Sequence, residues 1–415
     1  MGAANNTPLT LASPLPFGAG PSSPNRVMKS AMSEALGTSD HNPDERLVRL
    51  YRRWAEGGAG LLVTGNVMID RCALGEPGNV VLEDDRALDA FVAWAAAVHA
   101  ANATTVLWMQ INHPGKQSPS VVSKVPVAPS AVPLTGSIAK AFNPPRALED
   151  AEIEGLVARF AASAALAERA GFHGVQIHAA HGYLVSQFLS PHHNRREDRW
   201  GGSAENRRRF LLEIYRAIRS RTGPGFSVAV KLNSADFQRG GFTEEESLQV
   251  VSELGEAGID LIEISGGTYE KPAMTGSQRP STVAREAYFL DFAAKARAAT
   301  SAPLAVTGGF RSAAAMQEAL SSGATDLIGL ARPLALYPDL PQSLLNDPEF
   351  KVTLPAPSSG NKKLDAALML DVTWYEHQLA RMGAGDEPDP SAGVWGTVWG
   401  LVRTGGAAVF RKRRA

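Results

Sequence analysis

The chain has 415 residues, of which 44% are hydrophobic and 20% are charged, and its formal net charge is −1. This is the composition of a folded globular protein, and a charge so close to zero gives no reason to expect nucleic acid as a partner. The single cysteine, Cys72, excludes an intrachain disulfide, a thiolate zinc site and a cysteine-bound iron–sulfur cluster. Residues 1–24 lack a basic and apolar leader, so we expect a cytoplasmic protein with no membrane span.

Short runs rich in Val, Ile and Leu alternate along the chain with longer segments of helical period. This alternation is typical of βα units repeated around a parallel sheet. The predicted strands are Val27–Met32, Gly60–Val67, Thr105–Gln110, Gly174–Ile177, Ser227–Leu232, Leu261–Ser265, Leu304–Thr307 and Leu327–Gly329. The predicted helices are Pro43–Glu56, Asp84–Ala101, Asp150–Ala170, Ala204–Arg221, Thr243–Ala257, Arg285–Ala299, Ser312–Ser321 and a shorter one near Tyr337–Leu345.

Helix start and stop signals support these boundaries. Ser203 precedes the fourth helix, and Thr243 with Glu246 forms a capping-box pattern before the fifth. Glycines such as Gly171 and Gly323 follow helices where a left-handed residue is needed. Eight units predict an α/β protein with one closed (β/α)8 TIM barrel. The alternative is an open doubly wound sheet, against which the missing Gly-x-Gly-x-x-Gly motif after the first strand argues.

The predicted barrel covers residues 25–346, with an N-terminal arm at 1–24 and a linker, helix and tail at 347–415. The connection Asn112–Ala147, after the third strand, is too long for an ordinary βα loop, and we expect it to cover the barrel mouth. The extension contains a predicted helix at Leu364–Met382, which we expect to pack on the barrel or on a second subunit, so a homo-oligomer stays open. Trp395 and Trp399 are likewise expected to pack either on the chain's own barrel or on a neighbouring subunit. The basic run Arg411–Arg414 is interpreted as a solvated terminus.

Glycine-rich turns follow the last two predicted strands. Gly308 and Gly309 lie in Thr-Gly-Gly-Phe after the seventh strand, and Gly329 and Arg332 lie in Gly-Leu-Ala-Arg after the eighth. Glycine lets backbone N–H groups approach a phosphate closely, and the phosphate site of barrel enzymes is at this position. Arg332 would add a charge-assisted contact. Plain turn geometry is the alternative explanation, but the consecutive placement favours a phosphate-bearing cofactor.

Polar residues also end three other predicted strands, and one of them is informative. Lys231 follows Val228-Ala-Val in an apolar strand, where an ammonium group is costly unless it meets a negative partner. That partner is either an anionic ligand or a buried acidic side chain. Gln110 and Ser33 end the third and first strands, so the three side chains are expected at one rim.

His178, His181 and Tyr183 follow the fourth strand, where the alternation of Val175 and Ile177 ends. Two imidazoles and a phenol at a strand end suit an anionic or carbonyl ligand. A metal site is the alternative, but the segment is not a helix that presents both histidines, and no nearby carboxylate completes a ligand set.

At this point the chain closely resembles the Old Yellow Enzyme family of FMN-dependent ene-reductases. The resemblance covers about Leu15–Asn346, and its most specific part is His-Ala-Ala-His-Gly-Tyr-Leu-x-x-Gln-Phe-Leu-Ser-Pro through Arg-Trp-Gly-Gly-Ser-x-Glu-Asn-Arg. Supporting segments begin at Asn25, Gln110, Thr307 and Gly329. Together they make a chance match improbable.

The resemblance implies positions for the flavin. Ser33 stands where relatives use Thr or Cys beside the flavin O4, and Lys231 stands where they often have Arg beside N1 and the C2 carbonyl. Lysine keeps the charge but loses the planar fork of arginine. By the same resemblance, Ala31 and Met32 border the ring, Gly65 or Asn66 and Gln110 meet its pyrimidine edge, and Gly308, Gly309, Gly329 and Arg332 hold the phosphate.

The resemblance also implies the chemistry. His178 and His181 match the pair that binds the activating oxygen of the substrate, with His178 also next to the cofactor, and Tyr183 matches the proton donor. Tyr269 either lines the substrate pocket or only closes the barrel rim. The implied reaction is ping-pong, with hydride passing from NADPH or NADH to FMN and then to the β-carbon of an electron-poor alkene, an α,β-unsaturated carbonyl or nitro compound.

Two functions other than an ene-reductase are alternatives for this sequence. One is a 2,4-dienoyl-thioester reductase-like enzyme without the iron–sulfur and pyridine-nucleotide domains of its larger relatives, which need several cysteines. The other is a non-catalytic flavin-binding redox protein. The intact residues His178, His181 and Tyr183 argue against the loss of catalysis.

Overall fold

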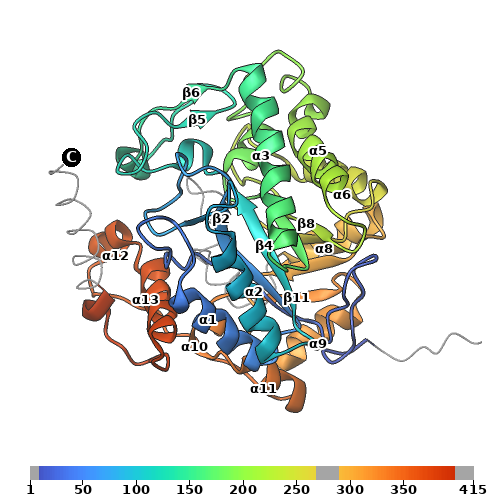
Figure 1. Ribbon diagram of the computed structural model, residues 1–415, viewed down its shortest axis with the longest axis vertical. Coiled ribbons are helices and arrows are strands. Elements are labelled where there is room, and N and C mark those ends of the chain that lie inside the picture. Colours follow the sequence, from blue (N-terminus) through green and yellow to red (C-terminus); the bar gives the residue numbers. More distant parts are fainter. Residues whose placement is uncertain (1–8, 268–288, 398–415) are drawn as a thin grey trace, which may run out of the picture.

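Eight parallel strands close into a barrel in the computed structural model, which describes residues 9–267 and 289–397 (Figure 1). Strand β1 pairs with both β2 and β11, which joins the two ends of the sheet. The short β3 (Val80–Val81) pairs with β2 outside the barrel. The TIM barrel prediction is confirmed. Its strands are β1 (Val27–Lys29), β2 (Leu61–Met68), β4 (Val106–Asn112), β7 (Gly174–Ala179), β8 (Ser227–Asn233), β9 (Leu261–Ser265), β10 (Leu304–Thr307) and β11 (Leu327–Leu330).

Helices cover the outside of the barrel, and two begin as the sequence predicts. The Ser203 hydroxyl accepts from the N–H of Asn206, and Thr243 and Glu246 form the capping box. Outside the barrel lie α1 (Glu45–Glu56), α2 (Leu88–Ala101), α3 (Asp150–Arg169), α4 (Leu184–Leu189), α5 (Ala204–Arg221), α6 (Glu244–Glu256), α8 (Leu290–Ala299), α9 (Ala313–Ser321), α10 (Arg332–Leu336) and α11 (Leu340–Asn346). The helix predicted near Tyr337–Leu345 is α11, and the separate helix α10 ends just before it, because Tyr337 precedes Pro338 and a residue before proline avoids the helical conformation.

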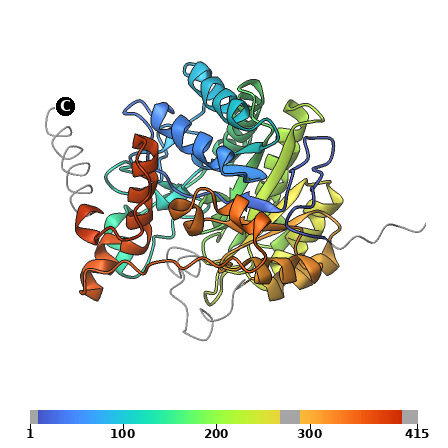
Figure 2. The same cartoon turned by 90° about the horizontal axis from the view of Figure 1, so that it is seen from below.

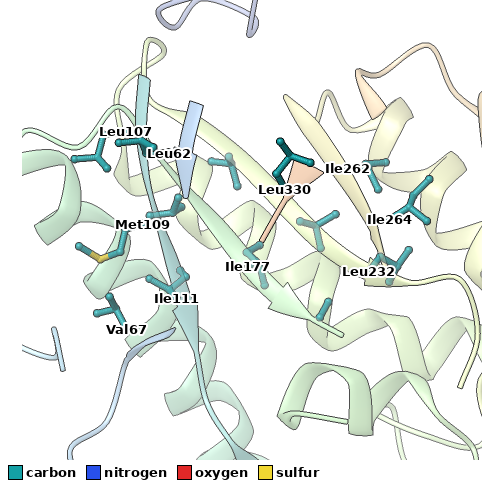
Figure 3. Close-up of a cluster of buried hydrophobic side chains, with 14 of the residues drawn as sticks. Leu62, Val67, Leu107, Met109, Ile111, Ile177, Leu232, Ile262, Ile264 and Leu330 are labelled. Carbon is teal, nitrogen blue, oxygen red and sulfur yellow. The ribbon is translucent and has the colours of Figure 1, made fainter. Parts of the chain in front are cut away.

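Alternation along the strands divides the apolar side chains between two cores. Outward residues such as Ile177 and Ile262 pack under the helices (Figure 3). Inside the barrel, Phe17 is fully buried, and its ring lies 4.5 Å from that of Trp108. Phe17 comes from the segment before β1, where Leu15 and Ser23 pair antiparallel. The segment before the first strand therefore contributes a side chain to the core inside the barrel.

The long connection after β4 has its own structure. It contains the 3-10 turns η1 (Gly115–Gln117) and η2 (Ser137–Ala141) and a two-stranded parallel sheet of β5 (Val127–Ala128) and β6 (Arg146–Ala147). The Lys116 ammonium donates to His193 Nδ1 at 2.9 Å and to the Val132 carbonyl at 3.1 Å. The connection is thereby anchored to the segment that follows α4.

The C-terminal extension packs on the barrel of its own chain (Figures 1 and 2). It forms α12 (Lys362–Leu368) and α13 (Leu370–Ala384) in place of one predicted helix, because Met369 between them is left-handed at φ 48°. Helix α13 lies along α1 and α10, and its Gly383 carbonyl accepts from Arg49 Nη1 at 2.5 Å. A Cβ on Gly383 would lie 3.1 Å from the Arg46 carbonyl oxygen, so glycine allows this close approach.

Trp395 and Trp399 were expected to pack either on the barrel of their own chain or on a second subunit. Trp395 is 59% exposed, so it does not pack into the core of its own barrel. Trp399 lies outside the described residues. Across the described ranges, none of the helices combines the length and the hydropathy that crossing a bilayer requires.

Candidate active site

A cavity of about 250 Å³ lies where the barrel strands end. Its wall holds side chains or backbone at or just after the ends of six strands and, in addition, from helix α13. Eight of the residues predicted to bind the cofactor are on this wall, together with His181: Ala31, Met32, Ser33, Lys231, Gly308, Gly309, Gly329 and Arg332. The structure thus brings together residues that are up to 301 positions apart in the sequence.

The glycines at one end of the cavity are required by the backbone. Gly308 and Gly309 have φ of 131° and 91°, which side chains other than that of glycine adopt only with strain. A Cβ on Gly329 would lie 1.9 Å from Thr307 Oγ1 and 2.6 Å from Ser30 Oγ. With Arg332 on the same wall, this cradle fits a phosphate group held by backbone N–H donors and one guanidinium.

Gly329→Ala is expected to destabilise the protein by about 1–3 kcal/mol, because the added methyl group overlaps Thr307 and Ser30. It is also expected to weaken FMN binding, since the cradle must widen. Thermal unfolding and the flavin retained after gel filtration measure the two effects. Gly155→Ala on α3 is the matched control: a Cβ there meets nothing within 4 Å, so stability should stay unchanged or rise slightly. Equal behaviour of the two variants would contradict the close packing at Gly329.

Lys231 has a buried acidic partner, which is one of the two possibilities that the sequence left open. Its ammonium lies 3.0 Å from Glu263 Oε1, and both side chains are nearly inaccessible to solvent. Glu263 also accepts hydrogen bonds from Thr307 Oγ1 at 2.6 Å and from Gln176 Nε2 at 2.8 Å. Burial alone would raise the pKa of Glu263, but the Lys231 charge and these hydrogen bonds bring the pKa below its ordinary value. The buried ion pair is therefore present, and Lys231 reaches the cavity as well.

Gln110 and Gly65 lie next to this network, and neither is among the described residues of the cavity wall. Gln110 Nε2 donates to Gln176 Oε1 at 2.7 Å. The Gly65 N–H donates to Tyr51 Oη at 2.8 Å and to Glu34 Oε1 at 3.2 Å. The polar groups of Gln110 and Gly65 are therefore hydrogen-bonded to other groups of the protein in this structure.

The three residues of the His-x-x-His-x-Tyr segment are packed against one another. The His178 ring centroid lies 5.1 Å from that of His181 and 4.7 Å from that of Tyr183. His181 is left-handed at φ 62°, its N–H donates to Asn233 Oδ1 at 3.2 Å, and its Nε2 lies 2.8 Å from Ser265 Oγ. His181 is on the cavity wall, whereas His178 and Tyr183 lie behind it.

Both imidazoles are neutral near pH 7. Burial, and then the charges of His181 and Lys231, hold the pKa of His178 well below its usual value. Burial and the charge of Lys231 do the same to the pKa of His181. The Ala180 N–H donates to His178 Nδ1 at 3.2 Å, so the proton of neutral His178 is on Nε2. A neutral imidazole with its N–H directed at a ligand donates a hydrogen bond without adding a full charge.

The lowered pKa values predict a pH dependence of stability. Below pH 6.5 the unfolded chain protonates both histidines while the folded protein does not, so stability falls as the pH falls through 6.5. The slope is at most about 1.4 kcal/mol per pH unit for each imidazole. Replacing His178 and His181 with Asn should make the loss of stability between pH 6.5 and 5 shallower, as measured by urea unfolding. An unchanged slope would contradict neutral buried imidazoles.

Other residues of the site left only weak signals in the sequence. Gln176 and Glu263 alternate with apolar residues in strands of the predicted barrel, so a polar side chain at an inward position was a usable sign. Ser265 and Asn233 end strands in the same way. Nothing in the sequence pointed to Asp371, Val372, Tyr375, Glu376 and Leu379, which α13 adds to the cavity wall. Tyr269, a predicted substrate residue, lies outside the described residues.

Comparison with known proteins agrees with this geometry. Residues 11–348 match the model of the NADH:flavin oxidoreductase / NADH oxidase family. The chain is 40% identical over 364 residues to the NADH-dependent flavin oxidoreductase iliE of Hypocrea jecorina, covering 81% of this chain and 89% of the relative. A similar protein of Neonectria sp. is 38% identical over 393 residues, covering 88% of this chain, and the chain spans about half (51%) of its length.

Solved structures show the same relationship. An Old Yellow Enzyme homologue from Zymomonas mobilis superposes with a TM-score of 0.69 at 28% identity, covering 83% of this chain and 95% of the homologue. Morphinone reductase superposes with a TM-score of 0.68 at 26% identity, covering 86% of this chain and 94% of that enzyme. The chain therefore belongs to the NADH:flavin oxidoreductase / NADH oxidase family, whose members include the Old Yellow Enzyme homologues, and it is an oxidoreductase of this flavin-dependent class.

Proposed function

We propose that this protein is an FMN-dependent ene-reductase that oxidises NADH or NADPH and reduces the C=C bond of α,β-unsaturated carbonyl or nitro compounds. One observation carries the proposal: a single cavity has a glycine cradle with Arg332 at its wall and also contacts Lys231 and His181. The glycine cradle with Arg332 suits a phosphate, and Lys231 with His181 suits an electron-rich ring beside a polar substrate.

In this proposal, Gly308, Gly309, Gly329 and Arg332 hold the phosphate of FMN. Ala31, Met32 and Ser33 border its ring system, Lys231 stabilises negative charge on it, and Gly65 and Gln110 lie at its pyrimidine edge. To contact the ring, Gly65 and Gln110 would each replace a hydrogen bond within the protein by a hydrogen bond to the ring. When bound, FMN supplies the two-electron chemistry that no side chain of the protein has, because it accepts hydride from a nicotinamide and donates hydride to an alkene.

His178 and His181 bind the carbonyl or nitro oxygen of the substrate. Because both are neutral, each offers an N–H to the negative charge that develops on this oxygen when hydride reaches the β-carbon. His178 also contacts the cofactor. Tyr183 gives its phenolic proton to the α-carbon, and Tyr269 lines the substrate pocket. Nicotinamide and alkene use the same space in turn, which makes the kinetics ping-pong.

The names of relatives support parts of this proposal. The Hypocrea and Neonectria relatives are called NADH-dependent, which favours NADH as the donor. A morphinone reductase structure holds tetrahydroNAD. A relative from Clostridium sporogenes, named cinnamate reductase, acts by its name on a compound whose C=C bond is conjugated to a carboxylate.

The absorption spectrum of the purified protein tests the proposal first. Flavin bands should be present, should bleach on anaerobic addition of NADH or NADPH, and should return on addition of cyclohexenone. A protein without flavin would refute the assignment of the cavity. A reduced flavin that no activated alkene reoxidises would refute the ene-reductase activity while leaving the flavin site intact.

A further inference from the structure

Three carboxyl groups from separate segments lie near enough to one another to interact electrostatically, and one of them is on the cavity wall. Glu34 follows β1, Glu76 lies between β2 and β3, and Glu376 is on α13 of the C-terminal extension. Glu376 and Ser33 are on the cavity wall, and the Ser33 hydroxyl donates to Glu76 Oε1. We call Glu34, Glu76 and Glu376 the carboxyl cluster. The reaction proposed above uses none of its members.

The members differ in their partners. Glu34 accepts from the Lys29 ammonium at 3.0 Å and from Tyr51 Oη at 2.5 Å, so it has a cationic partner within the protein. Glu76 accepts from Asn79 Nδ2 at 2.9 Å and from Ser33. Within the described part of the chain, Glu376 forms neither a hydrogen bond nor a salt bridge, and it is half-buried on the cavity wall.

The position of the cluster is fixed by close packing. The Gly37 N–H donates to the Gly78 carbonyl at 2.8 Å, and a Cβ on Gly78 would lie 2.3 Å from the Ala35 carbonyl oxygen. The loops that carry Glu34 and Glu76 are therefore interlocked. Helix α13 is held by the Arg49 contact with Gly383 and by Trp374, whose Nε1 donates to the Ala392 carbonyl at 3.0 Å.

The cluster holds a proton near neutral pH. Burial, then the charges of Glu76 and Glu34, raise the pKa of Glu376 to about 8. Burial and the charge of Glu34 also raise the pKa of Glu76. Other charged or titratable groups face the same cavity wall or bind Glu34; they are His181, Lys231, Arg311, Arg332, Asp371 and Tyr375 on the wall, and Lys29 and Tyr51 on Glu34. Lys29 is bound to Glu34 and Lys231 to Glu263, so neither neutralises Glu376.

We propose that the carboxyl cluster, completed by Glu376 of the C-terminal extension, takes up one proton from water when the cofactor in the cavity is reduced. This inference rests on the proposed function, because it requires FMN in this cavity. A hydride brings two electrons and one proton, and so adds one negative charge to the cavity. Added negative charge favours the neutral form of a neighbouring carboxyl, and Ser33 links the cavity to Glu76 by a hydrogen bond. The proton balances the charge that the hydride brings.

The midpoint potential of bound FMN, measured from pH 6 to 9.5, tests the proposal. The wild-type potential should fall more steeply with pH above about 8, where Glu376 is ionised before reduction, than that of Glu376→Gln, whose amide cannot ionise. The variant should also have the more positive potential above pH 8, since one negative charge near the cofactor is gone. Asp386→Asn is the control, because it removes a carboxylate from an exposed residue just beyond α13. It should keep the wild-type slope.

The outcomes separate this inference from the proposed function. Parallel curves for the wild type and Glu376→Gln, with flavin bound to both, would overturn the proton uptake and leave the flavin site standing. A wild-type protein without flavin would overturn both. If Glu376→Gln releases FMN, Glu76→Gln serves as the second variant and should flatten the slope in the same direction. Parallel curves for that pair would equally overturn the inference.

The apoprotein gives a readout that is independent of flavin. Because the pKa of Glu376 is raised on folding, its own contribution to stability declines as pH rises between 4.5 and about 8; the decline is measured above about pH 7, where His178 and His181 no longer contribute a slope of opposite sign. Glu376→Gln should flatten that decline in urea unfolding. An unchanged decline would show that Glu376 does not hold the proton, and would overturn the cluster.

Discussion

Tyr183→Phe is expected to slow reduction of an activated alkene by about 10²–10⁴-fold, the usual contribution of a positioned acid. The phenyl ring keeps the packing against His178, where the centroids lie 4.7 Å apart, while the transferable proton is lost. Reduction of the protein by NADH should be unaffected. Anaerobic stopped-flow measurement of the two half-reactions at the flavin absorption band separates these effects.

The control for this variant is Tyr215→Phe. Tyr215 lies on α5, and its hydroxyl donates to the Ala257 carbonyl at 2.9 Å, away from the cavity. Both half-reactions should keep their wild-type rates. If alkene reduction by Tyr183→Phe is as fast as in the wild type, another group supplies the proton and the role proposed for Tyr183 is wrong. If the nicotinamide half-reaction slows equally, Tyr183 acts on the shape of the cavity and not as an acid.

Glu263→Gln is expected to lower the free energy of unfolding by about 3–5 kcal/mol, because it leaves the buried Lys231 ammonium without its counter-charge. Glutamine preserves the size of the side chain, so little of the loss comes from packing. Urea unfolding at pH 7 measures the effect. The double variant Lys231→Met with Glu263→Gln should recover much of the loss, since removing both charges removes the unpaired one.

An exposed ion pair is the control for the buried one. Lys295 on α8 forms a salt bridge with Glu244 on α6, and both are solvent-exposed or partly so. Glu244→Gln should cost less than about 1 kcal/mol. A similarly small cost for Glu263→Gln would mean that Lys231 loses its proton or finds another anion in the barrel. Since Lys231 is also proposed to contact FMN, the variants should be compared without bound flavin, as bound cofactor would add its own stabilisation.

Much of the site could be predicted from local sequence alone. The glycines at 308, 309 and 329 and the polar residues at strand ends follow from a parallel barrel, because all its strands end at one rim. Lys231 could be recognised as needing an anion, but its partner could not be chosen, because Glu263 is 32 residues away and only the register of β8 beside β9 places the two together. Gln110 illustrates the same limit, since its bond to Gln176 depends on the pairing of β4 with β7.

The barrel could be predicted from the sequence, because periodicity and helix caps act over a few residues, and the same reasoning indicated which strand ends carry chemistry. It also indicated that a helix follows the barrel, though not the break at Met369, where a left-handed residue is required by the packing of α12 and α13 and not by local preference. Only the tertiary structure decided that α13 forms part of the cavity wall and brings Glu376 to Glu34 and Glu76. The approach of α13 to α1 joins side chains that are more than 300 residues apart in the chain, and no pattern along the sequence encodes such a contact.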